Sequence, residues 1–515
     1  MSLDTVDSED EVGTGDEGAS DSVTGDSSGT SRIEGSPVKS FFLGEIPDEH
    51  LFPFPSFDSD EAETVRIVLD SIDKFMEPKG PEYRTYDEQG YQPETYIESL
   101  KELGLFGLII PEEYGGLGFS NLAYSRVIQQ SSRFDASTSL TIGAHSSIGM
   151  KGLLLFGNAN QKAKYLPKLA TGEMVASFCL TEPGSGSDAA SIKTTASKNA
   201  DGSWSLSGEK IWITNGAFAS FFTVFARTDG DAGKLSAFIV ERAWDGVSTG
   251  PKEDKLGIRA SATTSVRFDK VNVPAENLLG EEGKGFKIAM AILNNGRTGL
   301  GGGCVGGMKA CIALASKQAA ERKQFGQPIA EFGLIKEKIA QMTVDCFAAE
   351  SVVTMVGHYI DSGYKDCSVE AAISKVFNTE ALWRTANEAL QIAAGNGYMK
   401  EFPYERIVRD SRINMIFEGT NEILRLYIAL SGMKDAGAYL KTVLKSAESI
   451  FNHPIKGFGV LSEYATKRFT QLTTVGRDRI VTVVAPQLQD EALIFEKYAL
   501  ELGRATDTIL RKHGK

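Results

Sequence analysis

Residues 412–423 read RINMIFEGTNEI, an apolar segment that ends at the carboxylate of Glu418, with Gly419 directly after it. The ordinary explanation is a helix start with an acidic residue near its N-terminus, where the helix dipole favours negative charge. The alternative is a catalytic base, because a carboxyl group that loses its water binds protons more tightly. The rest of the chain decides between these two interpretations.

The composition indicates a folded protein of several domains. The 515 residues allow roughly three or four domains, and 42% of them are hydrophobic, which is enough for a sizeable core. No uninterrupted apolar run approaches the roughly 18 residues of a membrane-spanning helix. The net charge of −14 argues against nucleic acid as a partner. The five cysteines show neither a CxxC pair nor zinc spacing, and five scattered histidines argue against a histidine-based metal site.

The N-terminal segment is expected to be disordered. Residues 1–36 hold ten acidic residues and one basic residue, Arg32, and almost no large apolar residues. Such a composition cannot bury enough surface to fold. A mitochondrial transit peptide would be basic, and a secretory signal would have an apolar centre. A cytoplasmic, bacterial location is therefore predicted, with the mitochondrial matrix or inner-membrane face as the alternative.

The remaining chain is predicted to change from helices to strands and back to helices. Residues 60–175 have helical spacing, as in ESLKELGLFGLII. Residues 178–275 hold short β-rich segments, such as KLSAFIVER and SVRFDKVNVP, between turn-forming residues. From about residue 285 the helical pattern returns. A stripe with alternating spacings of four and three predicts a long helix of a bundle: Ile335, Ile339, Met342, Cys346, Ala349 and Val353.

The segment FCLTEPGSGSDAASIKTTA begins at Phe178 and places turn formers and hydroxyl groups between two β segments. Gly184 and Gly186 would let the backbone approach a ligand closely. The exposed N–H groups, with Ser185 and Ser187, could hold phosphate or ring carbonyl oxygens. An ordinary surface loop is the alternative.

The strand GEKIWITNG is a second candidate. The two-residue repeat of a strand predicts Lys210, Trp212 and Thr214 on one face of the sheet. A tryptophan beside a threonine could cover a flat aromatic cofactor. A half-buried tryptophan of an ordinary sheet is the alternative.

The segment GLGGGCVGG contains a formal GxGxxG pattern at residues 301–306. No strand precedes it, so the βαβ context that dinucleotide binding needs is missing. Small residues for close helix packing, or a locally flexible segment, are the preferred interpretation.

Two further segments have both a functional and an ordinary explanation. In ERKQFGQPI, Arg322 suits a pyrophosphate and Phe325 an adenine or a ring edge, although a solvated helix end explains them as well. In QIAAGNGYM, Gln391 and Gly395 could contact a ligand, although glycine is also expected where a helix ends.

Together, and in this order, these segments resemble the acyl-CoA dehydrogenase family. The matching motifs are LTEPGSGSD, KIWITNG, RKQFG, QIAAGNGY and RDSRINMIFEGTNEILRL, and the resemblance extends from about residue 95 to about residue 435. TIGAHSSIG, AILNNGR, FGLIKEKIA and EFPYERIVRDSRI are most similar to the very-long-chain branch and its complex I-assembly relative.

The resemblance implies an α+β fold with a helical N-terminal domain, a middle β-barrel or sandwich, a C-terminal four-helix bundle and a partial helical extension. The predicted divisions are a disordered acidic tail at 1–40, the N-terminal domain at 41–177, the β domain at 178–288, the bundle at 289–435 and the extension at 436–515.

The resemblance also implies FAD as the cofactor. Residues of the first loop resemble the flavin cradle, Trp212 and Thr214 the cover of the isoalloxazine, and Arg322 and Phe325 contacts to the FAD of a neighbouring subunit. Gln391 and Gly395 resemble contacts to the pyrophosphate and adenosine end. The implied FAD-binding residues are Phe178, Leu180, Thr181, Gly186, Ser187, Trp212, Thr214, Arg322, Phe325, Gln391, Gly395, Thr420 and Glu422.

By the same resemblance, Glu418 is the general base that removes the Cα proton of an acyl-CoA while the Cβ hydrogen leaves as hydride to flavin N5. The product is trans-2-enoyl-CoA, as in the first step of fatty acid β-oxidation. An electron-transferring flavoprotein is the implied electron acceptor. A homodimer or higher homo-oligomer is expected, with at most peripheral membrane contact.

The substrate contacts implied by the resemblance are Ser139, Gly143, Ser187, Asn294, Arg297 and Gly419. Medium-chain relatives close the acyl pocket with two large side chains at the positions of Ser139 and Gly143. The small residues here predict a deep pocket and long acyl chains. Two alternatives remain: a respiratory-complex assembly or scaffold protein on the same fold, and a dehydrogenase of shorter or branched chains.

Overall fold

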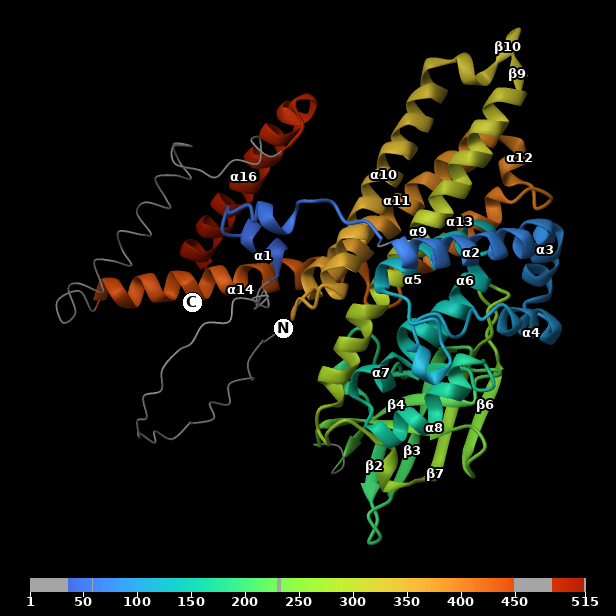
Figure 1. Ribbon diagram of the computed structural model, residues 1–515, viewed down its shortest axis with the longest axis vertical. Coiled ribbons are helices and arrows are strands. Elements are labelled where there is room, and N and C mark those ends of the chain that lie inside the picture. Colours follow the sequence, from blue (N-terminus) through green and yellow to red (C-terminus); the bar gives the residue numbers. More distant parts are fainter. Residues whose placement is uncertain (1–35, 58, 229–232, 449–483, 514–515) are drawn as a thin grey trace.

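The computed structural model describes residues 36–57, 59–228, 233–448 and 484–513. Figure 1 shows a helical body with a β-sheet at one end of it. The predicted order of helices, strands and helices is confirmed. Most of residues 1–40, predicted to be a disordered tail, lie outside the described residues, but the end of this segment forms the short helix α1, Pro37–Phe41.

Helices α2 to α6 surround one hydrophobic core, whereas α7 and α8 pack against the sheet. Capping residues set where several of them begin: Ser120 accepts from the backbone of Ala123 at the start of α5, and Asp135 accepts from Thr138 at the start of α6. A π-helical turn, Ala144–Gly149, follows α6. The helices are α2 (Ser59–Met76), α3 (Gly80–Gln89), α4 (Glu94–Glu102), α5 (Asn121–Phe134), α6 (Ala136–Gly143), α7 (Lys151–Phe156) and α8 (Ala159–Ala170).

The middle part of the chain forms one open sheet of eight strands, in the order β6-β7-β3-β2-β4-β5-β8, with β1 parallel to β4. The predicted barrel is wrong for the described residues, because β6 and β8 are edges that do not pair with each other. The strands are β1 (Ala176–Cys179), β2 (Thr195–Lys198), β3 (Trp204–Thr214), β4 (Phe221–Thr228), β5 (Leu235–Glu241), β6 (Val247–Lys252), β7 (Thr263–Val273) and β8 (Leu278–Leu279).

Strand β4 connects two hydrophobic cores, because successive side chains of a strand point to opposite faces. Phe221 and Phe225 pack in a core with residues of α8 and the start of α9. Phe222 and Val224 pack in a second core with residues of β3 and β7. The helices therefore cover one face of the sheet, as Figure 1 shows for α7 and α8.

The described residues from 285 to 448 contain four long helices, α9, α10, α11 and α14. In α10, Met342, Cys346, Ala349 and Val353 of the predicted stripe are buried, which confirms this face of the helix. The predicted divisions at 288/289 and 435/436 fall inside α9 and α14. The elements are α9 (Gly285–Glu321), β9 (Lys323–Gln324), β10 (Gln327–Pro328), α10 (Gly333–Asp361), α11 (Ser368–Ala393), α12 (Gly395–Tyr398), α13 (Tyr404–Arg412) and α14 (Asn421–Glu448).

Helices α9 and α10 are long and apolar enough to cross a membrane by length and composition alone. Core helices of proteins without membrane spans meet the same criterion. In α9, 56% of the apolar window is buried inside the structure, and the helix packs against α5, α10 and α11. The two helices are thus weak evidence for a membrane span.

The predicted helical extension contains α16, Gln489–His513, and residues 449–483 lie outside the described part. Helix α16 packs against α14 and α1. The rings of Phe41 and Phe495 meet edge to face with centroids 5.6 Å apart. Helix α1 is in turn anchored to the bundle by Lys39, whose ammonium group lies 2.8 Å from Asp366. The N-terminal segment thus joins the extension to the bundle.

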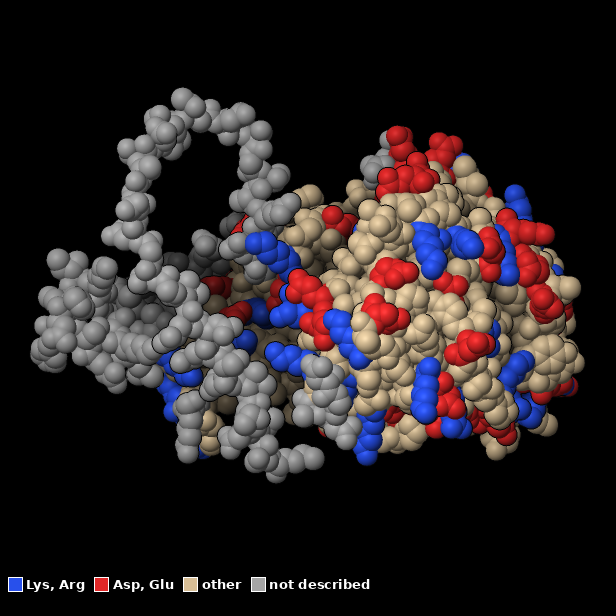
Figure 2. Space-filling view, turned by 90° about the horizontal axis from the view of Figure 1, so that it is seen from below, with Lys and Arg blue, Asp and Glu red and all other residues tan. Residues whose placement is uncertain are grey.

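Acidic and basic side chains alternate over the exposed face in Figure 2. Residues of both signs lie side by side over most of the described part of this face. The acidity of the chain is concentrated in residues 1–36, where most of the excess of acidic residues lies.

Candidate active site

Glu418 and Gly419 form a left-handed turn between the short helix Ile413–Met415 and α14, with φ angles of +55° and +92°. This conformation costs a residue with a side chain roughly 1–3 kcal/mol and persists only where the surroundings hold it. Such strain often occurs at functional sites. A Cβ atom at Gly419 would also lie 3.3 Å from Leu424. The conformation of the turn thus supplies a reason for glycine at this position besides the implied contact with a substrate.

The carboxyl group of Glu418 is buried in part and has one free oxygen. Its Oε2 atom is shielded from solvent and has no hydrogen-bond partner among the described residues. Burial raises the pKa of Glu418, and the positive charges of Arg297 and Lys375 oppose this rise. An unpaired carboxylate oxygen in a dry environment is a suitable proton acceptor.

Arg297 of α9 contacts the backbone of this turn. Its guanidinium group donates to the Glu418 carbonyl oxygen over 3.3 Å and to Asn294 Oδ1 over 2.6 Å. The side chain is almost fully buried. Asn294 and Arg297, three residues apart on one helix, therefore lie together beside the turn, as helical spacing requires.

Lys375 of α11 lies beneath the turn and is a residue that the sequence analysis missed. It is fully buried, and its ammonium group donates to the Gly419 carbonyl oxygen over 2.8 Å and to Asn421 Oδ1 over 2.7 Å. A signal was present in the sequence, because Lys375 interrupts the apolar segment AAISKVF at a helical spacing that places it on the buried face.

One cavity of about 1160 Å³ adjoins the turn. Residues of the N-terminal helices, the sheet, α9 and α13 line it. Most predicted site residues line this cavity, although they come from five distant segments of the chain. The predicted residues that line it are Ser139, Gly143, Phe178, Leu180, Thr181, Gly186, Ser187, Trp212, Thr214, Asn294, Arg297, Glu418 and Gly419.

Glycines of α9 line the cavity on one side of the helix and allow close contact with α5 on another. Gly299, Gly303 and Gly307 recur at every fourth residue and line the cavity. A Cβ atom at Gly306 would lie 2.0 Å from the Gln129 carbonyl oxygen, so this glycine lets α9 approach α5 closely. Close helix packing is thus confirmed, but the lining of a cavity by the remaining glycines was not foreseen.

Of the predicted common face, Trp212 and Thr214 both line the cavity, whereas Lys210 does not. A bulge between Lys210 and Ile213 shifts the pairing of β3 with β7, and Trp212 has a φ of +57°. The two-residue alternation is therefore broken. Lys210 is fully buried, whereas Trp212 is 64% exposed on the cavity side. Trp212 therefore lies in the cavity wall beside Thr214, and the buried position of Lys210 is what alternation alone did not predict.

The loop after β1 is held by a buried ion pair that the sequence analysis also missed. Lys210 lies 2.7 Å from Glu182, and its ammonium group also donates to the Leu180 carbonyl oxygen. Gly184 and Gly186 of this loop would carry a Cβ atom without any neighbour within 4 Å, so the backbone faces open space. The loop is thus rigid at its base and accessible at its tip.

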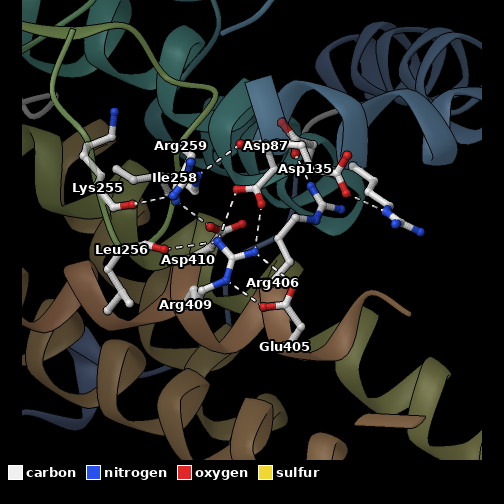
Figure 3. A network of polar contacts seen from close by, with 12 residues as sticks. Asp87, Asp135, Lys255, Leu256, Ile258, Arg259, Glu405, Arg406, Arg409 and Asp410 are labelled. Carbon is white, nitrogen blue, oxygen red and sulfur yellow. Dashed lines mark hydrogen bonds and ion pairs between the residues drawn. The ribbon is translucent and has the colours of Figure 1, made fainter. Parts of the chain in front are cut away.

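A charged network, shown in Figure 3, holds α13 against the rest of the site. Arg409 donates to Asp87 of α3 over 2.8 Å and to Glu405 over 2.6 Å. Arg406 donates to Asp135 over 2.7 Å. Asp410 accepts from the Ile258 backbone, and burial raises the pKa of Asp410 to about 7. These contacts join helices and sheet just before the chain reaches Glu418.

Comparison with known proteins identifies the family. Family models described as the N-terminal, middle and C-terminal domains of acyl-CoA dehydrogenase match residues 62–173, 177–271 and 283–433. The chain belongs to the acyl-CoA dehydrogenase family. The family consists of flavin-dependent oxidoreductases, so the predictions of fold family and of an enzyme are confirmed.

Relatives of this acyl-CoA dehydrogenase occur in mitochondria and in bacteria. The mitochondrial very long-chain specific acyl-CoA dehydrogenase of Bos taurus is 45% identical over 470 residues, which cover 89% of this chain and 71% of that protein. A probable acyl-CoA dehydrogenase of Bacillus subtilis is 42% identical over 418 residues, or 77% of this chain and 69% of that protein.

A solved structure shows the same fold. The acyl-CoA dehydrogenase of Bacillus anthracis, complexed with FAD, is 37% identical and superposes with a TM-score of 0.73, covering 92% of this chain and 86% of that chain.

Six predicted residues of this acyl-CoA dehydrogenase do not line the cavity. Phe325, at the tip of the β9–β10 hairpin, is 93% exposed and has a φ of +52°. The hairpin and α12 lie toward the same end of the bundle in Figure 1. Thr420 directly precedes α14, and its hydroxyl group accepts from the Ile423 backbone. The six residues are Arg322, Phe325, Gln391, Gly395, Thr420 and Glu422.

Proposed function

We propose that this acyl-CoA dehydrogenase oxidises long-chain acyl-CoA to trans-2-enoyl-CoA, the first step of fatty acid β-oxidation, with Glu418 as the general base. The observation that carries the proposal is the buried Oε2 atom of Glu418, which lacks a hydrogen-bond partner among the described residues and adjoins the cavity. Buried polar atoms without a partner are rare. A carboxylate with a free lone pair beside a cavity suits removal of a proton from a bound molecule.

The chain contributes two groups to proton removal. Glu418 takes the proton from Cα of the acyl chain. Its backbone N–H, which has no hydrogen-bond partner among the described residues, donates to the thioester carbonyl oxygen. That hydrogen bond strengthens as negative charge develops on the oxygen, so it lowers the barrier to enolate formation. Arg297, through the Glu418 carbonyl oxygen, keeps the turn in place.

FAD fits the loop and bulge on the sheet side of the cavity. The chemistry that bound FAD supplies is acceptance of the Cβ hydrogen as hydride. The open backbone at Gly184 and Gly186 suits close approach of a ligand, and Trp212 offers an exposed aromatic surface. Phe178, Leu180, Thr181, Ser187 and Thr214 would complete this binding surface from the same wall.

The residues outside the cavity suit a cofactor shared between two copies of the chain. Arg322 and Phe325 extend from the end of α9, where they would reach the FAD of a neighbouring subunit. Gln391 and Gly395 would hold its pyrophosphate and adenosine end, and Thr420 and Glu422 would contact FAD beside the turn. We therefore propose a homodimer or higher homo-oligomer, with an electron-transferring flavoprotein as the acceptor.

The depth of the cavity supports long substrates. Ser139 and Gly143 line it together with Gly299, Gly303 and Gly307, so these five positions add little side-chain volume to its wall. Asn294, Arg297 and Ser187 would contact the thioester end of acyl-CoA. A long alkyl chain gains about 0.8 kcal/mol for each methylene group that leaves water, which favours long chains in a deep apolar pocket.

The test is flavin reduction by acyl-CoAs of graded length under anaerobic conditions. The purified protein should carry oxidised flavin, and palmitoyl-CoA should bleach its visible absorbance. Glu418→Gln should keep the flavin and lose turnover by about 10³-fold or more, because the base is removed. Glu113→Gln, at an exposed carboxylate in the short helix Glu112–Tyr114, is the matched control.

Two results would contradict the proposal. A protein that fails to take up FAD would refute the cofactor, and full turnover by Glu418→Gln would refute the base. Co-purification with a respiratory complex that survives Glu418→Gln, in a protein without dehydrogenase activity, would favour the assembly function instead.

A further inference from the structure

Lys375 is a buried cation without an acidic partner at contact distance. Its side chain is fully buried, and no carboxylate among the described residues lies within 4.0 Å of its ammonium group. Burying a charge without a paired counter-charge is costly, so such lysines are rare in protein interiors. The two hydrogen-bond acceptors of Lys375, the Gly419 carbonyl oxygen and Asn421 Oδ1, both belong to the segment that carries Glu418.

The contacts of Lys375 hold the left-handed turn from behind. Gly419 and Asn421 lie on either side of Thr420, so one ammonium group fixes both ends of this short link. Asn421 is fixed to α11 as well, because its amide donates to Thr379 and Glu380, each over 3.0 Å. The strained conformation at Glu418 and Gly419 is therefore maintained by contacts to α11.

The charge of Lys375 also acts on the Glu418 carboxyl group. Lys375 from α11 and Arg297 from α9 are the positive groups that favour the ionised form of Glu418. Arg297 is buried on the α9 side of the turn, so the two cations come from different helices. Attraction between opposite charges is strong where water is excluded. Removing either cation would leave the buried carboxylate harder to ionise.

We propose that Lys375 is a positioning residue for the dehydrogenation: its ammonium group holds the Glu418–Gly419 turn and keeps the Glu418 carboxyl group ionised. This inference rests on the proposed function of Glu418 as the base. Groups that face Lys375 are Glu418 and Glu422 on the turn and α14, and Arg297 and Cys304 on α9. Burial lowers the pKa of Lys375 itself to about 8, so its charge would decrease toward alkaline pH.

The experiment compares the pH dependence of kcat/KM for palmitoyl-CoA in the flavin-loaded protein and its variants. Lys375→Met removes the charge and the donors, and Lys375→Arg restores both. Loss of the charge should move the acid limb of the profile upward by about one pH unit or more, because a nearby opposite charge lowers a carboxyl pKa by that amount. At pH 7, kcat should fall by about tenfold, while KM changes by less than about threefold.

Lys309→Met is the matched control, because Lys309 is a half-buried lysine of the same bundle that pairs with Glu350 away from the turn. It should leave the pH profile unchanged, and Lys375→Arg should return the acid limb toward the wild-type position. A wild-type profile in Lys375→Met, or an equal shift in Lys309→Met, would overturn the inference.

A second measurement tests the inference even if Lys375→Met folds too poorly for kinetics. The free energy of unfolding is measured for Lys375→Gln and Glu418→Gln, singly and combined. Non-additive effects, with a smaller loss from Lys375→Gln in the Glu418→Gln background, would support the charge interaction, and additive effects would overturn it. Full activity in Glu418→Gln would instead refute the proposed base. An inactive Glu418→Gln with an unshifted Lys375→Met profile would refute only the function of Lys375.

Discussion

The ammonium group of Lys210 lies 2.7 Å from Glu182 Oε1, in the interior of the protein beneath the loop that follows β1. Glu182 also accepts from the backbone of Thr194 over 3.0 Å, and Lys210 donates to the Leu180 carbonyl oxygen. These contacts hold the pKa of Glu182 below its usual range. The ion pair therefore joins the start of the loop, the strand β3 and the segment before β2.

Removing one partner of the Lys210–Glu182 ion pair should strongly destabilise the protein. Lys210→Met leaves the buried carboxylate of Glu182 without its cation, and such a loss typically costs about 3–5 kcal/mol. Urea unfolding should show this decrease in the free energy of unfolding. The double variant Lys210→Met, Glu182→Gln should lose less than the sum of the two single losses. Additive losses would show that the pair does not act as a unit.

Acid should weaken the fold through His145. This fully buried imidazole accepts from the Ala176 backbone over 3.0 Å, and its other ring nitrogen lies 3.1 Å from the Phe106 carbonyl oxygen. Burial lowers the pKa of His145 to about 4. In the unfolded chain, where a histidine has a pKa of about 6.5, this imidazole is protonated between pH 6.5 and 4, whereas in the folded protein it stays neutral. The free energy of unfolding should therefore fall by about 3 kcal/mol as the pH decreases from about 6.5 to about 4.

Urea unfolding at several pH values between 7 and 4 measures this effect. His145→Gln keeps hydrogen-bonding capacity but cannot titrate, so its stability should change less steeply with pH than that of the wild type. Parallel curves for the two proteins would contradict the prediction and assign the acid sensitivity to other groups.

Gly303 should control which chain lengths react. A Cβ atom there would lie 3.6 Å from Ile128 and 3.8 Å from Ser139, which is ordinary contact, so Gly303→Ala should fold normally. Gly303→Val would fill the cavity further. Its turnover of palmitoyl-CoA should fall by about tenfold or more, since overpacking costs about 1–3 kcal/mol, while butyryl-CoA should still react.

The matched comparison for Gly303 is Gly306 on the adjacent turn of α9. A Cβ atom at Gly306 would meet the Gln129 backbone at 2.0 Å, so Gly306→Ala should destabilise the fold without changing the preferred chain length. An equal loss for long and short substrates in Gly303→Val would contradict a selective function for Gly303.

Replacing Gly419 should impair the turn even by a single methyl group. Gly419→Ala adds a side chain at a φ of +92°, where strain of roughly 1–3 kcal/mol is expected. We expect the flavin content to stay and kcat to fall by about tenfold or more, because the base would be displaced. Anaerobic single-turnover reduction measures this directly. Wild-type reduction rates in Gly419→Ala would show that the turn tolerates the strain.

Local patterns in the sequence were sufficient for the order of the elements. Helical spacing identified the buried stripe of α10 around Cys346 and Ala349, because burial follows the 3.6-residue repeat directly. The motif around Glu418 and the loop after β1 line one cavity, as their resemblance to a family implied. The prediction of a barrel was wrong because strand propensity does not determine whether the two edge strands, β6 and β8, pair with each other.

The sequence by itself determined which segments are helices and strands, where the turn glycines lie and which family motifs are present, because these depend on neighbours along the chain. Only the tertiary structure decided that Lys375 supports the turn at Gly419 and that strand β3 carries a bulge between Lys210 and Ile213. Both depend on contacts between segments far apart in sequence. The free energy of such contacts comes from burial and charge in the folded state, which no local pattern records.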